Sequence, residues 1–246
     1  MLLQYVLGKK IILEKPSSAI TVVVSSRDDA NIKQEFIKHV QNTCGCVCHL
    51  YFLVNSGVAL TKIYDDMMKK PDGVDDVIIF MHDDIEFLRE GWGTEVLRLF
   101  NTYPEYGIIG VAGSAEFDSG AAWWNYKKKY GQVLHRHDGK AWLTAFSPLL
   151  DHDLEEVCVI DGLFMAVHKQ RVTEPFDLDF GGFNHYDTSF CLANYLDGMT
   201  KIGVTTNIRI AHNSVGEMKD EWYVNREILN RKFGEYYPIT VKKGKK

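Results

Sequence analysis

The strongest constraint on the fold is the alternation of apolar runs with amphipathic segments between residues 20 and 111. The runs Ile20–Val24, Val47–Val54, Val77–Met81 and Ile108–Val111 have the length and composition of buried strands. Between them, apolar side chains recur at helical spacing in three segments, 32–40, 60–68 and 92–103. Such alternation implies right-handed crossovers. We therefore expect an α/β protein with a central, mostly parallel sheet flanked by helices.

The second half of the chain is less regular. Residues 113–156 show no clear periodicity, and a long irregular stretch usually carries function. Regularity returns in the patterns that predict a strand over 157–167 broken by Asp161-Gly162, a helix over 188–196, a strand over 201–210 that ends at His212, and a last helix with Trp222, Leu229 and Phe233 on one side. No internal repeat divides the chain, so we expect a single domain.

Composition excludes several classes of protein. The 246 residues are 46% hydrophobic, enough for a sizeable core, and the formal net charge of −5 argues against nucleic-acid binding. Five cysteines, no apolar stretch of membrane-spanning length and no signal-peptide pattern predict a cytoplasmic location. The basic tail, Lys242, Lys243, Lys245 and Lys246, is expected to be a solvated terminus, with peripheral contact to anionic lipid as its alternative.

The tripeptide His82-Asp83-Asp84 follows the apolar run 77–81. Open α/β sheets bind ligands beyond the carboxyl ends of their strands, and a carboxylate there can hold Mg²⁺ or Mn²⁺ together with phosphate oxygens. Alternate side chains of an extended turn face the same way, so His82 and Asp84 can address one side. The alternative is that both aspartates cap a helix that begins near Phe87.

Three cysteines and a histidine, Cys44, Cys46, Cys48 and His49, invite a zinc hypothesis. Residues two apart on a strand point the same way but lie roughly 6 to 7 Å apart, too far for neighbouring corners of a tetrahedron unless the chain bends sharply. We therefore do not predict a zinc site.

The chain contains several short motifs in the same order as they occur in a known family. They are His82-Asp83-Asp84 after a buried strand, Asp161-Gly162, Phe176-Asp177, Gly181-Gly182, His185-Tyr186-Asp187 and the late His212. Over roughly residues 20–215 the sequence resembles the inverting family-2-like glycosyltransferases of the GT-A fold. The resemblance implies a nucleotide-sugar-binding half at about 16–113, an acceptor-binding half at 114–215, and a C-terminal helix and tail at 216–246.

The sequence departs from the family pattern at three places. His82 replaces the first aspartate of the metal motif, Tyr186-Asp187 replaces the usual acidic pair, and Asn55 stands where an aspartate often receives the base. These departures resemble a divergent subgroup with a His-Asp-Asp motif.

The resemblance implies a metal-assisted reaction. Asp84 and His212 are the expected ligands of Mn²⁺ or Mg²⁺, and a nitrogen ligand favours Mn²⁺. Asp187 is the expected general base that accepts the proton of the acceptor hydroxyl. For His212 the alternative is a buried, hydrogen-bonded histidine, and for Asp187 it is a helix N-cap, where the helix terminus would lower its pKa.

The remaining candidates are assigned to the donor and to the acceptor. The expected nucleotide-sugar contacts are Ser25, Arg27, Asn55, His82 and Asp83. Arg27 can stack on a base or pair with phosphate, or it forms a surface salt bridge. The expected sugar or acceptor contacts are Asp161, Gly162, Trp123, Trp124 and His185, with core packing as the alternative for both tryptophans.

We expect the function to be transfer of a sugar from a nucleotide diphosphate sugar, a UDP-sugar, to a hydroxyl of a glycan or lipid-linked acceptor. One alternative is a metal-dependent nucleotidyltransferase, but residues 25–30 lack the Gly-rich basic loop that such enzymes place after the first strand. The other is a non-catalytic domain that binds a nucleotide sugar or a glycan.

Overall fold

The structure is a computed structural model that describes residues 3–6, 9–12, 18–28, 32–54, 57–70 and 74–242. The first two ranges contain the antiparallel pair β1 (Leu3–Val6) and β2 (Lys9–Ile12). Among the described residues, none of the helices combines the length and the apolar composition that a membrane crossing requires.

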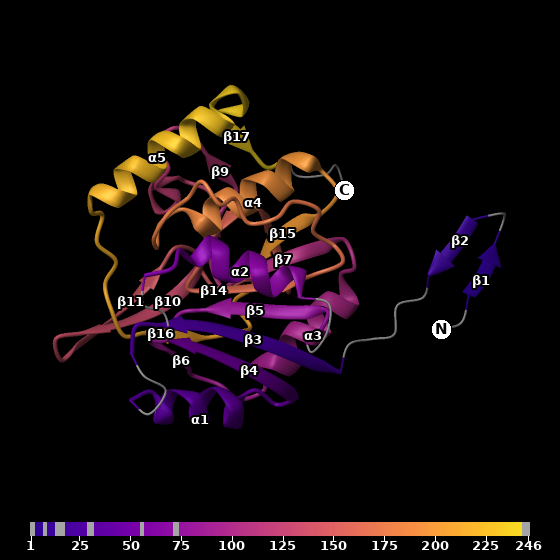
Figure 1. Ribbon diagram of the computed structural model, residues 1–246, viewed down its shortest axis with the longest axis horizontal. Coiled ribbons are helices and arrows are strands. Elements are labelled where there is room, and N and C mark those ends of the chain that lie inside the picture. Colours follow the sequence, from indigo (N-terminus) through magenta and orange to yellow (C-terminus); the bar gives the residue numbers. More distant parts are fainter. Residues whose placement is uncertain are drawn as a thin grey trace.

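A seven-stranded mixed sheet forms the centre of the molecule (Figure 1). Its strands, in spatial order, are β12 (Glu155–Val157), β15 (Lys201–Val204), β7 (Tyr106–Gly110), β14 (Phe164–His168), β5 (Val77–Met81), β3 (Ala19–Ser26) and β4 (Val47–Val54). Neighbouring strands are parallel in β4–β3, β3–β5 and β7–β15, and antiparallel in β5–β14, β14–β7 and β15–β12. Five strands therefore run one way, and β12 and β14 run against them.

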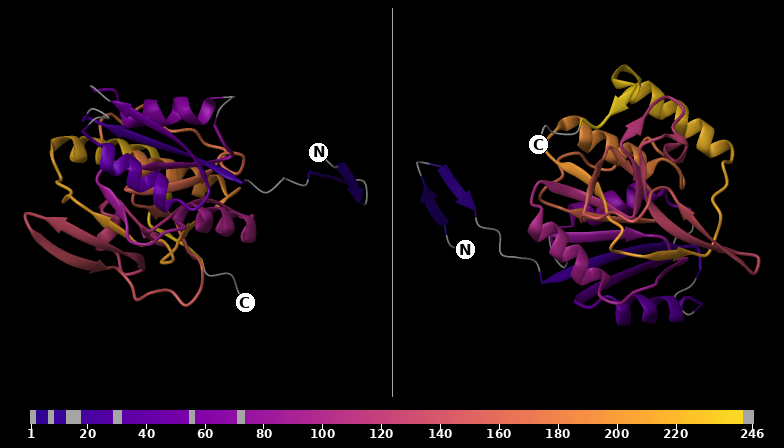
Figure 2. Two further views of the ribbon diagram at one scale, coloured as in Figure 1. Left: turned by 90° about the horizontal axis from the view of Figure 1, so that it is seen from below. Right: turned by 180° about the vertical axis from the view of Figure 1, so that it is seen from behind.

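Helices cover both faces of this sheet. They are α1 (Gln34–Thr43), α2 (Leu60–Lys69), α3 (Trp92–Thr102), α4 (Tyr186–Asp197) and α5 (Asp220–Phe233). Helix α2 lies in front of the sheet in Figure 1, and α3 lies on the opposite face, which Figure 2 shows from behind. The fully buried strands β5 and β14 thus pack on both sides, as their unbroken apolar sequences predict.

Aromatic side chains fill the space between the sheet and the helices. On the α2 side, the ring of Phe80 lies 4.3 Å from Tyr64 and 5.3 Å from Phe176, which stacks on Phe190 of α4 at 4.1 Å. The Phe-Asp pair of the sequence motif therefore supplies a core residue, Phe176, while Asp177 pairs with Lys232 of α5. This packing fixes α4 against β5 and so positions the first turn of α4.

A second sheet contains much of the stretch in which the sequence showed no periodicity. Its order is β13 (Val159–Ile160), β8 (Ala112–Ser114), β10 (Lys129–His137), β16 (Ile210–His212) and β6 (Ile85–Phe87), and β11 (Lys140–Ala145) pairs with β10. The turn η1 (Trp123–Asn125), the turn η2 (Gly234–Tyr236) and the pair β9 (Glu116–Phe117) and β17 (Ile239–Thr240) complete the described elements. Strands β8, β9 and β12 are too short to show a period, and the longer strands β10 and β11 are mostly half-buried or exposed, so their sequences lack a clear apolar alternation.

Two sequence predictions are corrected by this arrangement. No helix begins near Phe87, because Ile85–Phe87 is strand β6, and the next helix starts at Trp92 with Gly91 as its N-cap. Asp83 and Asp84 therefore cap no helix. The single strand predicted over 201–210 is two strands, β15 and β16, which belong to different sheets.

Candidate active site

The candidate site lies where three chain segments meet beyond the end of β5. Antiparallel pairing aligns Phe164 of β14 with Met81 of β5, which brings the preceding Asp161-Gly162 turn beside His82. Two backbone hydrogen bonds fasten the segments, from His82 N to Leu163 O at 3.1 Å and from Asn213 N to Asp84 O at 2.9 Å. The sequence motifs that follow β5, β13 and β16 thus form one site, as the sheet-edge argument predicts.

His82, Asp84 and His212 converge on one point. Each offers one ligand atom, and these atoms all lie within 4.8 Å of one another. Nε2 of His212 lies 3.2 Å from Oδ1 of Asp84, and Nδ1 of His82 lies 4.0 Å from the same oxygen. Two imidazole nitrogens and a carboxylate oxygen form a donor set suited to a first-row divalent cation.

The environment of Asp84 also fits a cation. Its Oδ1 atom is buried, and its polar neighbours are the ring nitrogens of His212 and His82. Burial alone would raise the pKa of Asp84, but the neighbouring His212 and His82 hold it well below its usual range. Asp84 is therefore ionised at neutral pH, with an oxygen that a bound cation would satisfy.

Tyr186 fixes the orientation of His82. The Tyr186 hydroxyl donates to the carbonyl of Gly162 at 3.0 Å and lies 3.2 Å from Nε2 of His82. Since the hydroxyl has only one proton, Nε2 of His82 must carry a proton and donate it to Tyr186. Burial lowers the pKa of His82, so the ring is neutral and its Nδ1 lone pair faces Asp84.

Asp187 lies in the first turn of α4, but it is not the N-cap of that helix. The N-cap is His185, and Asp187 accepts hydrogen bonds from the backbone N–H of Gly162 and of Thr188, both at 2.7 Å. Burial, together with the charge of Asp161, raises the pKa of Asp187 to about 7. The sequence-based expectation of a lowered pKa is therefore wrong, because burial and a like charge outweigh the helix terminus.

Gly162 is required by the close approach of α4. A Cβ atom at this position would lie 2.3 Å from the Tyr186 hydroxyl oxygen and 3.0 Å from the Cβ of Asp187. We expect Gly162→Ala to lower the free energy of unfolding by about 1–3 kcal/mol and to displace Asp187. Thermal unfolding and turnover measured side by side would check this. Gly216→Ala, at an exposed position with open space for a Cβ atom and no left-handed φ, is the control for glycine loss alone, and equal activity in both variants would contradict the prediction.

Asp83 points to a different set of partners. Its carboxylate accepts a hydrogen bond from Ser26 and forms an ion pair with Lys33 at 3.2 Å. Lys33 also contacts Asp28, at 3.3 Å, and the Lys33 side chain is only 21% exposed. The alternation expected for the tripeptide is present, since Asp84 faces His212 while Asp83 links to the end of β3.

The other residues expected to contact the nucleotide differ in their exposure. Ser25 is buried at the end of β3, and Arg27 is exposed. Asn55 lies outside the described residues. The assignment of these residues to the nucleotide stays a prediction.

The acceptor candidates are only partly brought together. Trp123 is 4% exposed and packs against Phe146 at 4.8 Å, so it belongs to the core and offers no platform for a sugar. Trp124 is half-buried beside Trp222. The ring of His185 also packs on Trp222, at 4.8 Å, and burial lowers its pKa to about 4. Asp161 and Gly162 do lie at the site.

The loop before α4 is held by α5. Asn225 donates hydrogen bonds to the carbonyls of Gly181 and Asn184, both at 2.9 Å, and Glu221 accepts one from the N–H of Phe183 at 2.7 Å. His185 follows with a left-handed φ of 62°. The start of the helix that carries Asp187 is therefore anchored by the C-terminal helix.

The cysteine cluster is closer than strand geometry predicts. Gly45, with φ of +82°, bends the chain and brings Sγ of Cys44 to 3.5 Å from Sγ of Cys46. Even so, among the residues that the structure describes, the group formed by His82, Asp84 and His212 is the one whose ligand atoms suit a metal ion. The absence of a zinc site at the cysteines stays a prediction.

Comparison with known sequences decides the family. Residues 21–236 match the family described as "Glycosyltransferase like family", which spans every motif of the site. The chain belongs to this glycosyltransferase family. A comparison with curated proteins found no match.

Solved structures show the GT-A fold of this family member. The catalytic domain of Drosophila beta1,4-galactosyltransferase 7, in complex with xylobiose, aligns with a TM-score of 0.50 at 12% identity, covering 85% of this chain and 80% of that one. GalNAc-T7 with UDP, GalNAc and Mn²⁺ aligns with a TM-score of 0.53 at 9% identity, covering 94% and 51%. A197 from STIV aligns at 0.45 and 12% identity, over 82% and 87%.

Sequence reasoning missed two residues of the site. Tyr186 was noticed only as a departure from the family pattern, although its position next to Asp187 was a signal of proximity. Lys33 gave no signal, because a lysine before an amphipathic helix is common on protein surfaces.

Proposed function

We propose that this family member is a metal-dependent, inverting glycosyltransferase that transfers a sugar from a UDP-sugar to a hydroxyl of a glycan. One observation carries the proposal. Three ligand atoms converge at the end of β5, and the half-buried carboxylate of Asp187 is linked to them through Gly162 and Tyr186. Hydrogen bonds through Gly162 and Tyr186 thus link the proposed cation ligands to the proposed base.

The proposed binding of the sugar donor is based on the three side chains that can hold a cation. Asp84, His212 and His82 would hold the cation, and the two nitrogens favour Mn²⁺ over Mg²⁺. A bound cation supplies Lewis-acid stabilisation of the negative charge that develops on a departing diphosphate. The neighbour GalNAc-T7, whose structure contains UDP and Mn²⁺, supports a UDP-sugar as donor. His82, which the sequence predicts as a nucleotide-sugar contact, also fits a ligand role through its Nδ1 atom.

The proposed activation of the acceptor hydroxyl is based on Asp187. With its pKa raised to about 7, the carboxylate is a stronger base than an ordinary aspartate and can still be ionised at neutral pH. The N–H groups of Gly162 and Thr188 fix its orientation. The xylobiose in the galactosyltransferase neighbour supports a glycan as acceptor.

The raised pKa of Asp187 predicts the pH dependence of turnover. A general base acts only when it is deprotonated, so turnover should fall as the pH drops through about 7. The loss should approach about tenfold per pH unit at lower pH. Initial rates at saturating donor between pH 5 and 9 would measure it, and the residual activity of Asp187→Asn should lack this inflection. An inflection near the pKa of an exposed aspartate would contradict the assignment.

Two measurements test the function. Calorimetric titration of UDP with and without Mn²⁺ should show binding that depends on the cation, and UDP release from UDP-sugars should occur in the presence of a glycan acceptor. Metal-dependent binding without UDP release from any UDP-sugar would support a non-catalytic binding domain. Release of diphosphate from a nucleoside triphosphate would support a nucleotidyltransferase instead.

A further inference from the structure

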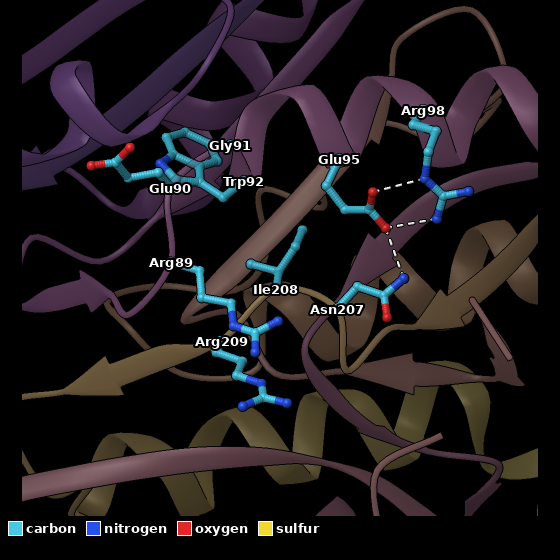
Figure 3. A pocket seen from close by; sticks show the side chains of 9 residues that line it. All are labelled: Arg89, Glu90, Gly91, Trp92, Glu95, Arg98, Asn207, Ile208 and Arg209. Atoms are coloured by element: carbon cyan, nitrogen blue, oxygen red, sulfur yellow. Dashed lines mark hydrogen bonds and ion pairs between the residues drawn. The ribbon is translucent and has the colours of Figure 1, made fainter. Parts of the chain in front are cut away.

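A cavity lies beside the N-terminal end of α3, with a volume of about 350 Å³ (Figure 3). Three arginines line it: Arg89, Arg98 and Arg209. The cavity also contains two carboxylates, those of Glu90 and Glu95. Its charge therefore depends on which arginines are already paired with carboxylates.

Arg98 is fully paired. Its guanidinium contacts Glu95 at 2.7 Å and Asp153 at 2.7 Å, and Asn207 donates to both of these carboxylates. Hydrogen bonds from Arg98 and Asn207 thus occupy the carboxylate of Glu95, as Figure 3 shows. Arg98 and Glu95 thus form a closed cluster that leaves little capacity for a ligand.

Arg89 and Arg209 are not paired in this way. Both line the cavity, and in Figure 3 their side chains extend in the same direction, while the carboxylate of Glu90 is directed away from them. Within the described ranges, neither arginine forms an ion pair, and the buried Nε atom of Arg209 has no hydrogen-bond acceptor. Arg89 is exposed at the mouth of the cavity and Arg209 is half-buried, and a guanidinium without an acidic partner attracts an anion.

The helix terminus itself does not supply the site. The N–H of Gly91 donates to Thr43 O at 2.7 Å, and those of Gly93 and Thr94 donate to Cys44 O at 2.9 and 3.3 Å. These N–H groups are therefore occupied by the end of α1. Recognition of an anion in this cavity depends on the two arginine side chains.

We propose that Arg89 and Arg209 form a binding site for a phosphate group, either inorganic phosphate or a phosphate monoester. A planar guanidinium binds two phosphate oxygens at once, and two such groups can hold opposite edges of one phosphate. The cavity volume is at the lower end of the range for small-ligand sites, which suits a phosphate or a compact phosphorylated molecule.

This site is distinct from the candidate active site. Ile85 pairs with His212 and Phe87 pairs with Ile210, and the N–H of Leu88 donates to Arg209 O at 2.9 Å. Arg209 therefore lies three residues from His212 along one extended segment, or about 10 Å. Side chains three apart on a strand emerge on opposite faces, so a phosphate held by Arg209 does not share the cation site.

Binding of inorganic phosphate and of methyl phosphate to the full chain, measured by calorimetry at low ionic strength, tests the proposal. We expect saturable binding, and at least about a tenfold rise in Kd when Arg89→Ala and Arg209→Ala are combined. Arg231→Ala is the matched control, because it removes an exposed arginine of α5 and should leave Kd unchanged. Tighter binding of one ligand identifies whether free phosphate or a monoester is preferred.

Two results would overturn the proposal. One is an equal phosphate affinity in the wild type and in the double variant, with circular dichroism showing that both are folded. The other is displacement of phosphate by UDP and Mn²⁺, which would place the phosphate in the donor site. Unchanged UDP affinity in the double variant would show that the two sites are separate, whatever the outcome for the transferase activity.

Discussion

Asp187→Asn should reduce turnover by at least about 100-fold while UDP binding in the presence of Mn²⁺ stays within about twofold of the wild type. Asparagine keeps the size of the side chain and one oxygen for the N–H groups of Gly162 and Thr188, but it cannot accept a proton from the acceptor hydroxyl. Steady-state UDP release at saturating donor and acceptor, together with calorimetric titration of UDP, measures both quantities. A loss in turnover without a loss in donor affinity identifies a base.

The matched control is Asp197→Asn, the same substitution at the other end of α4. Asp197 is exposed and accepts a hydrogen bond from Thr173 at 2.8 Å, so this variant should retain full turnover. Near-normal turnover of Asp187→Asn would leave Asp187 with a purely structural role, which is to fasten the start of α4 to the Asp161-Gly162 turn.

Asp84→Ala should abolish the part of UDP binding that depends on Mn²⁺, and with it the turnover. The variant leaves two imidazoles without the carboxylate beside them, so the group of three ligands loses its negatively charged member. Loss of one charged ligand should weaken cation affinity by about 100-fold or more. Titration of Mn²⁺ followed by its paramagnetic resonance signal measures cation binding directly, without donor or acceptor.

Asp66→Ala is the control for this substitution. Asp66 is an exposed carboxylate of α2 that pairs with Lys62, so its removal changes the net charge equally and should not alter Mn²⁺ affinity. Unchanged Mn²⁺ affinity in Asp84→Ala would remove Asp84 from the cation site and would contradict the proposed function.

The parts of the site that follow long apolar strands were predictable from the sequence. The run 77–81 predicted β5, and the rule for open sheets then placed His82 and Asp84 at a ligand-binding edge. Asp161-Gly162 was visible because a charged residue interrupts an apolar run. The final residue of β16, His212, was recognised by its order in the family pattern.

Features that depend on packing between distant segments were not predictable. The raised pKa of Asp187 results from burial and from the nearby Asp161, which local sequence does not report. The pairing of Asp83 with Lys33 joins residues fifty positions apart. Strand β6 was missed because three residues carry no measurable period, and the burial of Trp123 follows from its contact with Phe146. The cytoplasmic location and the division into two halves stay predictions.

Asn225 and Glu221 of α5 anchor the start of α4, so α5 affects some residues of the candidate site more directly than others. The residues that would hold the cation lie just beyond β5 and at the end of β16, and none of them forms a hydrogen bond with α5 among those described above. The start of α4, which α5 anchors, carries both Tyr186, which orients His82, and Asp187. We therefore expect substitutions in α5 to shift His82 and Asp187 together, although neither residue lies on that helix.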